Sequence, residues 1–214
     1  MSALIGLDEQ QARDDIIAAA RSLFSRSLTH GSTGNLSVRV GDRILVTPTG
    51  SSLGTVTADE LSVIDLAGRH VDGAAPSKES FLHAAVLRAR PTATAVVHTH
   101  STYSAAVSCL ADVDPASVLP PLTAYFAMRI GTLPLVPFHA PGDASLEPLA
   151  ESLARDHLAL LLANHGPVVA GVNLGAAMDA LEELEETAKL FLLLQGHPTR
   201  PLTAEQAHSL APKS

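Results

Sequence analysis

An apolar segment that ends in two alternating histidines constrains the fold of this chain more than any other feature. Ala95-Val96-Val97 leads directly into His98-Thr99-His100. Alternate residues of an extended strand point to the same face, so the two imidazoles can converge on one point. Imidazole is the commonest side-chain ligand for zinc and related metals. The pattern predicts a buried strand that carries two metal ligands or, equally, a strand with two polar residues on its solvated face.

Two distant motifs supply further candidate ligands. Glu79 lies upstream in Pro76-Ser77-Lys78-Glu79, and His165 lies downstream in Ala163-Asn164-His165-Gly166-Pro167. Imidazole nitrogens and carboxylate oxygens are both donors that divalent transition metals accept. Together with His98 and His100, these residues predict one divalent metal ion bound by three histidines and one carboxylate.

Length and composition favour one globular domain. The chain has 214 residues, of which 46% are hydrophobic and 17% are charged. A chain of this length can bury a substantial core, and this composition is not that of a disordered protein. We therefore expect a single domain over residues 1–214. We expect no membrane span, because no apolar run reaches the roughly 18–20 residues that one needs.

Charge and targeting signals narrow the partners and the compartment. The formal net charge of −8 argues against nucleic acid, which needs a basic surface, but not against an anionic small molecule. Residues 1–9 lack the basic and apolar stretches of a signal peptide. The one cysteine, Cys109, rules out an intramolecular disulfide and is expected in the core. These features predict a cytoplasmic protein.

Hydrophobic periodicity predicts strands that alternate with helices in an α/β domain. Residues 8–25 and 174–195 have helical periodicity, and we expect the glutamates of the second helix to face solvent, with Glu185 paired to Lys189. A further helix is expected to begin after Ser77 as its N-cap and to end before Pro91. The remaining expectations are a hairpin of strands 36–40 and 43–47, strands 96–99, 133–136, 158–163 and 167–170, a helix over 101–110, and mostly irregular structure over 111–145.

Five motifs follow one another along the chain: HGSTGNLSVR (30–39), TPTG (47–50), PSKE (76–79), VHTHS (97–101) and NHG (164–166). In their order and spacing they resemble the motifs of the class II aldolase/adducin superfamily. The resemblance extends over roughly residues 10–195. Within the superfamily, segments such as Met128-Arg129-Ile130-Gly131 and Pro141-Gly142-Asp143 are similar to the branch that decarboxylates 3-oxo-tetronate 4-phosphates.

The resemblance implies a fold, an assembly and a metal. The fold is α/β, a three-layer αβα sandwich around a mostly antiparallel central sheet. Members are commonly homotetramers with active sites between subunits, where a neighbour supplies a tyrosine that corresponds to Tyr125; that residue is equally well a packing aromatic. The metal, held by His98, His100, His165 and Glu79, is expected to be Zn²⁺, with Mn²⁺, Co²⁺ or Fe²⁺ as alternatives. Glu79 also matches the family carboxylate that exchanges protons with the substrate.

The chemistry of such a site identifies the reaction intermediate more closely than it identifies the substrate. A β-keto acid such as 3-oxo-tetronate 4-phosphate loses CO2 readily when a bound metal holds the resulting negative charge as an enediolate. Protonation of carbon C2 then gives dihydroxyacetone phosphate. An aldolase that cleaves a ketose 1-phosphate of the fuculose or rhamnulose type forms the same enediolate and is the main alternative. A noncatalytic, adducin-type interaction module is the alternative from another class.

Three pairs of residues are candidate ligands for the substrate and its phosphate. They are Ser32 with Asn35, Thr49 with Gly50, and Ser77 with Lys78, and they match the phosphate-binding loops of the family. Small residues let backbone N–H groups approach an anion, and hydroxyl and amide groups add donors. Each pair is also compatible with an ordinary turn or helix cap, and Lys78 can equally hold the substrate carboxylate.

Overall fold

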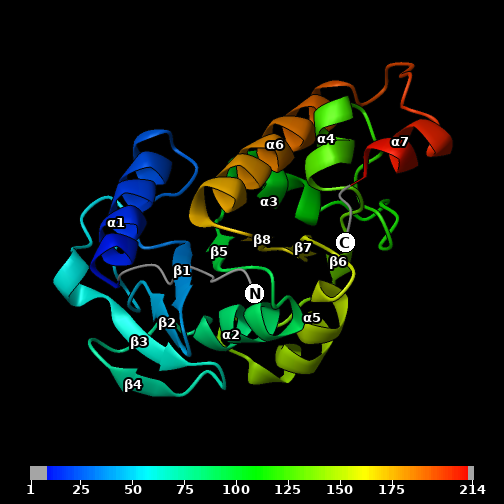
Figure 1. Ribbon diagram of the computed structural model, residues 1–214. Helices are drawn as coiled ribbons and strands as arrows, with labels where there is room; N and C mark the ends of the chain where they lie inside the picture. Colours follow the sequence, from blue (N-terminus) through cyan, green and yellow to red (C-terminus); the bar gives the residue numbers. More distant parts are fainter. Residues whose placement is uncertain (1–8, 212–214) are drawn as a thin grey trace.

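A mixed sheet forms the centre of the computed structural model, which describes residues 9–211 (Figure 1). Residues 1–8, on which the expectation about a signal peptide rests, lie outside the described residues. The strand order is β4-β3-β2-β1-β5-β8-β7-β6, and only the β6–β7 pair is parallel among the described strands. The strands are β1 (Asn35–Val40), β2 (Arg43–Val46), β3 (Ser62–Asp65), β4 (His70–Asp72), β5 (Ala95–His98), β6 (Leu135–Val136), β7 (Ala159–Leu162) and β8 (Gly166–Gly171).

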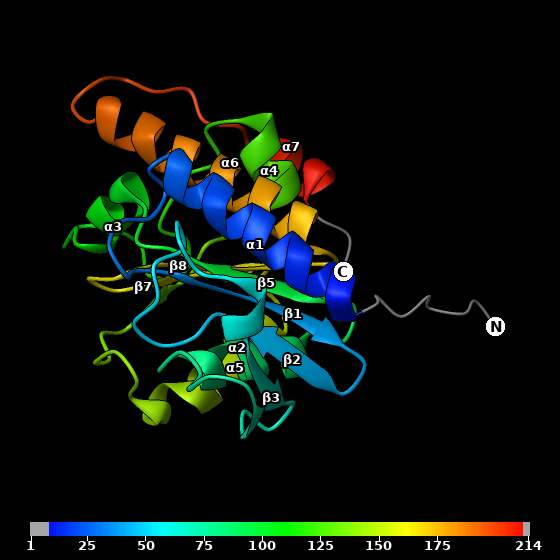
Figure 2. The ribbon, with the colours of Figure 1, turned by 90° about the vertical axis from the view of Figure 1, so that its left-hand side faces the viewer.

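Helices cover both faces of this sheet, as Figure 2 shows. One core lies between the sheet and the layer that contains α1, α3, α4 and α6, and a second core lies between the sheet and α2 with α5. This confirms the predicted three-layer αβα sandwich with a mostly antiparallel sheet. The helices are α1 (Glu9–Ser25), α2 (Ser80–Ala89), α3 (Thr102–Ser108), α4 (Ala124–Arg129), α5 (Glu147–Ala154), α6 (Leu174–Leu193) and α7 (Ala204–Leu210).

The central strand β5 explains why two cores are needed. Ala95 and Val97 point into the core beneath α1 and α6, whereas Val96 points into the core beside α2 and α5. Strands buried on both faces have continuous apolar sequences rather than alternating ones, which accounts for the run before His98. The same alternation sends the His98 side chain toward the α2 face of the sheet.

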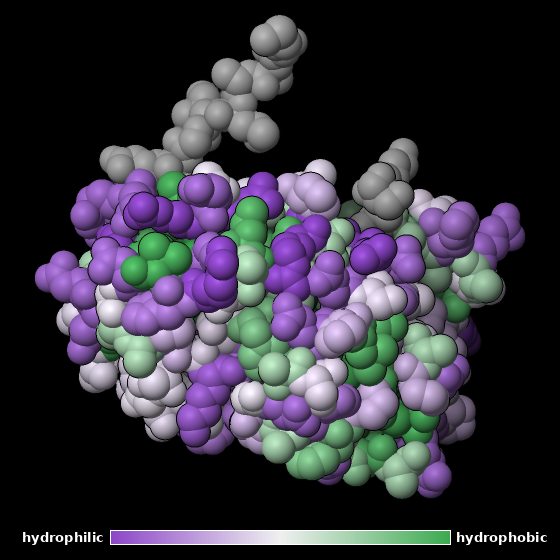
Figure 3. Space-filling model, turned by 90° about the horizontal axis from the view of Figure 1, so that it is seen from below, coloured by the Kyte–Doolittle hydropathy of each residue, from purple (hydrophilic) through white to green (hydrophobic). Residues whose placement is uncertain are grey.

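The layer of α2 and α5 is held together by charge as well as by apolar packing. Arg88 of α2 pairs with Glu147 and Glu151 of α5, each at 2.6 Å. Figure 3 shows the molecule from below, the side on which these helices lie in Figure 1, and hydrophilic and hydrophobic residues are interspersed there. None of the described helices is both long enough and apolar enough to span a membrane.

The expected N-cap of helix α2 is wrong. Helix α2 begins at Ser80, and its N-cap is Glu79 rather than Ser77. The backbone N–H of Ser80 donates to the carbonyl of Ser77 at 3.0 Å, so a tight turn precedes the helix and displaces the cap. Segment 111–145 is mostly irregular, as expected, and holds the short strand β6. It also contains α4, which was not expected and which the Thr123 side chain caps by accepting from the N–H of Phe126.

The acidic run on α6 and the lone cysteine also differ from expectation. Glu185 is only 5% exposed, and its carboxylate accepts hydrogen bonds from the first turn of α3, so it does not face solvent. Lys189 pairs with Glu186 at 3.6 Å instead of with Glu185. Cys109 is exposed, and it is the C-cap residue that follows the last residue of α3.

Candidate metal centre and substrate cavity

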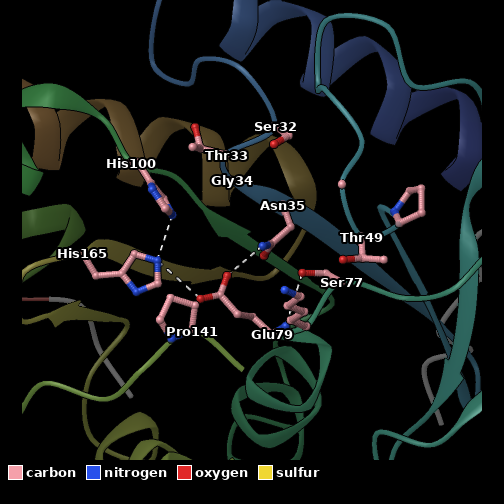
Figure 4. Close-up of a pocket in the computed structure, with 13 residues that line it drawn as sticks. Ser32, Thr33, Gly34, Asn35, Thr49, Ser77, Glu79, His100, Pro141 and His165 are labelled. Carbon is pink, nitrogen blue, oxygen red and sulfur yellow. Dashed lines mark hydrogen bonds and ion pairs between the residues drawn. The ribbon is translucent and has the colours of Figure 1, made fainter. Parts of the chain in front are cut away.

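Three histidines from two neighbouring segments converge at one edge of the sheet. His98 ends β5, His100 follows two residues later, and His165 lies in the turn between β7 and β8. Their ligand atoms lie within 4.8 Å of one another, with Nε2 of His165 at 2.8 Å from Nε2 of His100 and 3.3 Å from Nε2 of His98. Tetrahedral coordination at about 2.0–2.1 Å separates two nitrogen ligands by about 3.3 Å. The cluster therefore has the dimensions of a metal site, and Figure 4 shows two of its members, His100 and His165.

The NHG motif places His165 beside the other two histidines. Asn164 adopts a left-handed conformation with φ of 56°, which asparagine tolerates better than most residues. A Cβ atom on Gly166 would lie 2.2 Å from the carbonyl oxygen of Thr99. Because only glycine permits that close approach, the turn can press against the segment between His98 and His100.

The ionisation of the histidines suits lone-pair donation. Nδ1 of His98 lies 2.8 Å from the carbonyl oxygen of Pro167, to which it donates, so its Nε2 carries the free lone pair. Burial, followed by the charges of neighbouring histidines, lowers the pKa of His100 to about 3 and that of His165 to about 4. These imidazoles are neutral at neutral pH, the form that binds a metal.

Glu79 completes the cluster from the start of α2. Its Oε2 lies 3.3 Å from Nε2 of His98, its Oε1 lies 3.4 Å from Nε2 of His165, and Asn35 donates to Oε2 at 3.0 Å. Burial favours a raised pKa for the Glu79 carboxyl, but His98, the Asn35 hydrogen bond and the other histidines outweigh it and lower the pKa. Glu79 is therefore an anionic donor.

The structure thus brings together all four residues predicted to bind a metal. Three imidazoles and one carboxylate form a donor set that suits Zn²⁺ and other divalent first-row metals. The observed spacing and the tautomer of His98 fit such an ion.

A cavity of about 260 Å³ opens beside His100, His165 and Glu79 (Figure 4). All six residues predicted to bind the substrate and its phosphate lie on its wall. Hydroxyls, an amide and an ammonium group therefore surround a space that adjoins the metal ligands. The six are Ser32, Asn35, Thr49, Gly50, Ser77 and Lys78, and they are joined by Thr33, Gly34, Pro48 and Pro141.

Three of these additional residues lie within motifs that the sequence analysis had already identified as candidate substrate-binding segments. Thr33 and Gly34 stand inside HGSTGN, and Pro48 stands inside TPTG, so proximity to a candidate was sufficient to find them. Pro141 belongs to the family-like segment Pro141-Gly142-Asp143 in the loop after β6, but only the tertiary fold shows that this loop reaches the cavity.

Tyr125 is the predicted residue that the structure does not bring to the site. It lies on α4 with 59% of its surface exposed, and the Arg129 guanidinium lies 5.8 Å from the centre of its ring. Tyr125 is not one of the described residues that line the cavity. Within one chain it is a surface residue.

The fold and the site define an α/β protein whose three clustered histidines could hold a metal ion, and comparison with known proteins identifies its family. Residues 14–192 match the family of the class II aldolase and adducin N-terminal domain, and the chain belongs to this family. A 3-oxo-tetronate 4-phosphate decarboxylase from Pectobacterium atrosepticum is 46% identical over 204 residues, which cover 95% of this chain and 94% of the relative.

Two further comparisons place the chain within the family. The crystal structure of YgbL from Klebsiella pneumoniae is 44% identical, superposes with a TM-score of 0.93, and covers 96% of this chain and 100% of that one. An L-fuculose phosphate aldolase from Methanocaldococcus jannaschii is 37% identical over 181 residues, which cover 85% of this chain and 96% of the relative.

Proposed function

We propose that this protein is a metal-dependent decarboxylase that converts a 3-oxo-tetronate 4-phosphate into dihydroxyacetone phosphate and CO2. The observation that carries the proposal is the complete set of three histidines and Glu79 beside a cavity lined with anion-binding groups. The 46% identity to a decarboxylase of this substrate, over almost the full length of both chains, supports the same reaction.

The reaction requires stabilisation of charge next to a ketone. In the substrate, the C3 ketone lies β to the C1 carboxylate, so cleavage of the C1–C2 bond releases CO2 and leaves its electron pair delocalised toward the C3 oxygen. A divalent ion, when bound by His98, His100 and His165, supplies a Lewis acid for that negative charge. The cavity walls are proposed to hold the carbon chain in place.

Glu79 is proposed to deliver the proton that completes the reaction. After CO2 has left, C2 carries the negative charge and needs one proton to give dihydroxyacetone phosphate. Glu79 adjoins both the histidines and the cavity. Among the described residues that line the cavity, it is the one with a carboxyl group. Because its pKa is lowered in the free protein, it must first take up a proton when substrate changes its surroundings.

The remaining cavity residues are proposed to hold the two anionic ends of the substrate. Ser32, Thr49, Gly50 and Ser77 offer hydroxyl and backbone donors for the phosphate. The Lys78 ammonium group binds either the phosphate or the C1 carboxylate. Tyr125 is proposed to complete the site of a neighbouring subunit, which its exposure on α4 permits.

Three broader features belong to the same proposal. The ion is Zn²⁺, because imidazole and carboxylate donors suit it, although Mn²⁺, Co²⁺ and Fe²⁺ accept the same ligands. The assembly is a homotetramer with active sites between subunits, and the compartment is the cytoplasm, which the single cysteine supports. Sedimentation and elemental analysis of the purified protein test the first two.

The decisive experiment measures both products from one substrate. Zinc-loaded enzyme is given 3-oxo-tetronate 4-phosphate, and dihydroxyacetone phosphate is followed by NADH oxidation with a glycerol-phosphate dehydrogenase. We expect release that stops after EDTA treatment and that matches CO2 in a one-to-one ratio. No release from protein that holds metal would reject the decarboxylase.

The same assay discriminates the alternative, an aldolase that cleaves a ketose 1-phosphate. The 37% identity to an L-fuculose phosphate aldolase favours this second function. Fuculose 1-phosphate or rhamnulose 1-phosphate would then give dihydroxyacetone phosphate and an aldehyde without CO2. Purified protein that binds no metal and turns over neither substrate would instead favour a noncatalytic interaction module.

A further inference from the structure

A buried chain of hydrogen bonds runs from Glu79 away from the cavity. Asn35 Nδ2 donates to Glu79 Oε2 at 3.0 Å, and Asn35 Oδ1 is hydrogen-bonded to Nε2 of His83. Nδ1 of His83 lies 2.7 Å from Oγ of Ser37. His83 and Ser37 are both 0% exposed, so no solvent replaces these partners.

The spacing of these residues in the sequence explains why they form this chain of hydrogen bonds. Asn35 and Ser37 are alternate residues of β1, so both point to the face of the sheet that α2 covers. Glu79 and His83 are four residues apart at the start of α2, so they lie on one side of that helix. The pairing of Asn35 with His98 across β1 and β5 sets this row beside the metal ligands.

When the His83 ring is neutral, the donors and acceptors of this hydrogen-bonded chain have one consistent arrangement. The Glu79 carboxylate only accepts, so the Asn35 amide must present its NH2 group to Glu79 and its oxygen to His83. Nε2 of His83 must therefore carry the proton, and its Nδ1 must accept the proton of the Ser37 hydroxyl. His83 is neutral in this arrangement, and its burial lowers its pKa to about 3.

We propose that His83 is a positioning residue that, through Asn35, holds the Glu79 carboxylate in the orientation needed for proton transfer. Without the Nε2–H donor, the Asn35 amide can rotate and present its oxygen to Glu79, and two acceptors then repel each other. Both nitrogens of His83 are used within the chain, so it is not a metal ligand. This inference rests on the proposed role of Glu79.

The first test reads the tautomer of His83 directly and does not depend on the reaction. Long-range ¹H–¹⁵N spectra are recorded at neutral pH on zinc-loaded protein with ¹⁵N-labelled histidine, and His83→Gln identifies the His83 signals. We expect a neutral ring with the proton on Nε2. A proton on Nδ1, or a cationic ring, overturns the proposal even if the enzyme is active on the proposed substrate.

The second test separates positioning from stability by kinetics. We expect His83→Leu to lower kcat at least about tenfold, with KM changed by less than about twofold, because outer partners of site residues typically contribute 10–100-fold. His83→Gln keeps an N–H donor near the Nε2 position and should recover much of kcat. Wild-type kcat in His83→Leu, or no recovery in folded His83→Gln, overturns the proposal.

Leu87→Ala supplies the matched control. Leu87 lies one turn further along α2, is fully buried, and belongs to the apolar core rather than to the hydrogen-bonded chain. Its variant should lower the melting temperature without changing kcat. If His83→Leu does not fold, the spectra and His83→Gln still decide the matter. If wild-type enzyme fails on the proposed substrate, the proposed function falls while the spectra still test the tautomer.

Discussion

Glu185 and Ser104 are joined by two hydrogen bonds to a single carboxylate oxygen. Oε2 of Glu185 on α6 accepts from the backbone N–H of Ser104 at 2.8 Å and from its hydroxyl at 2.6 Å. Oε1 accepts from the N–H of Tyr103 at 2.8 Å. A buried carboxylate therefore accepts hydrogen bonds from the otherwise unpaired N–H groups of the first turn of α3, the helix that follows His100 closely in sequence. Its negative charge also interacts favourably with the positive N-terminal end of the helix dipole.

Glu185→Gln should destabilise the protein because its NH2 group would face donors that need an acceptor. The expected loss is about 1–3 kcal/mol of unfolding free energy, or a melting temperature lower by roughly 3–10 °C. The adjacent Glu186→Gln is the matched control, since Glu186 is exposed and forms only a 3.6 Å pair with Lys189. Equal melting temperatures for the two variants would contradict the capping role.

Glu79→Gln should preserve the fold and abolish most turnover. The amide keeps the size of the side chain but cannot carry the proton to C2, and general acid–base groups typically contribute 10²–10⁴-fold. Circular dichroism checks the fold, and the coupled assay measures kcat. A near-normal kcat in the folded variant would remove Glu79 from this role.

His100→Ala and His165→Ala should each weaken metal binding. Partners outside the ligand shell contribute 10–100-fold to affinity, so the loss of a direct ligand should cost at least about 100-fold. Elemental analysis after dialysis should find about one ion per wild-type chain and little in either variant. His70→Ala is the control, because His70 is exposed on β4. Full metal content in His100→Ala or His165→Ala would contradict the assigned site.

Lys78→Ala should raise KM for the phosphorylated substrate by about tenfold, since an ionic contact to a charged group is worth about 1.5–3 kcal/mol. Inhibition by inorganic phosphate then identifies the anion that Lys78 holds. Phosphate inhibition weakens if Lys78 binds the phosphate and stays unchanged if it binds the carboxylate. An unchanged KM would show that Lys78 contacts neither.

The metal-free protein should lose stability as the pH falls. The pKa of His83 is lowered by burial to about 3 from its ordinary value of 6.5, and those of His100 and His165 are lowered in the same direction. Below pH 6.5 the unfolded chain gains protons that the folded protein does not bind. Stability should therefore fall from pH 6.5 toward 3, by up to about 1.4 kcal/mol per pH unit from each such residue.

Urea unfolding of EDTA-treated protein between about pH 4.5 and 7 measures this dependence. His83→Gln is the internal comparison, because glutamine does not titrate and the slope should decrease by about one proton. Identical slopes for the wild type and this variant would show that His83 titrates normally in the folded protein.

Local sequence patterns were sufficient for much of the fold. The periodicity of residues 8–25 and 174–195 predicted α1 and α6, and the two short strands expected over 36–40 and 43–47 predicted the hairpin of β1 and β2. The alternation of His98 and His100 predicted two imidazoles on one side of β5, and the family motifs predicted the residues that line the cavity. These features depend on a few neighbouring residues, so the sequence carries them directly.

Other features depend on which segments meet. Strand β4 has three exposed residues and no hydrophobic pattern, so only its pairing with β3 defines it. Glu185 resembles its exposed neighbours in sequence, and its burial follows from the packing of α3 against α6.

The sequence by itself determined the main helices, the central hairpin and the chemical types of the site residues, because strand and helix periodicities are local properties. Only the tertiary structure decided that Asn35 meets His83 and Glu79, and that Glu185 meets Ser104. Hydrogen-bond partners separated by more than 40 residues are set by sheet order and helix placement. Such contacts arise when the whole chain buries its apolar surface, and no short segment encodes them.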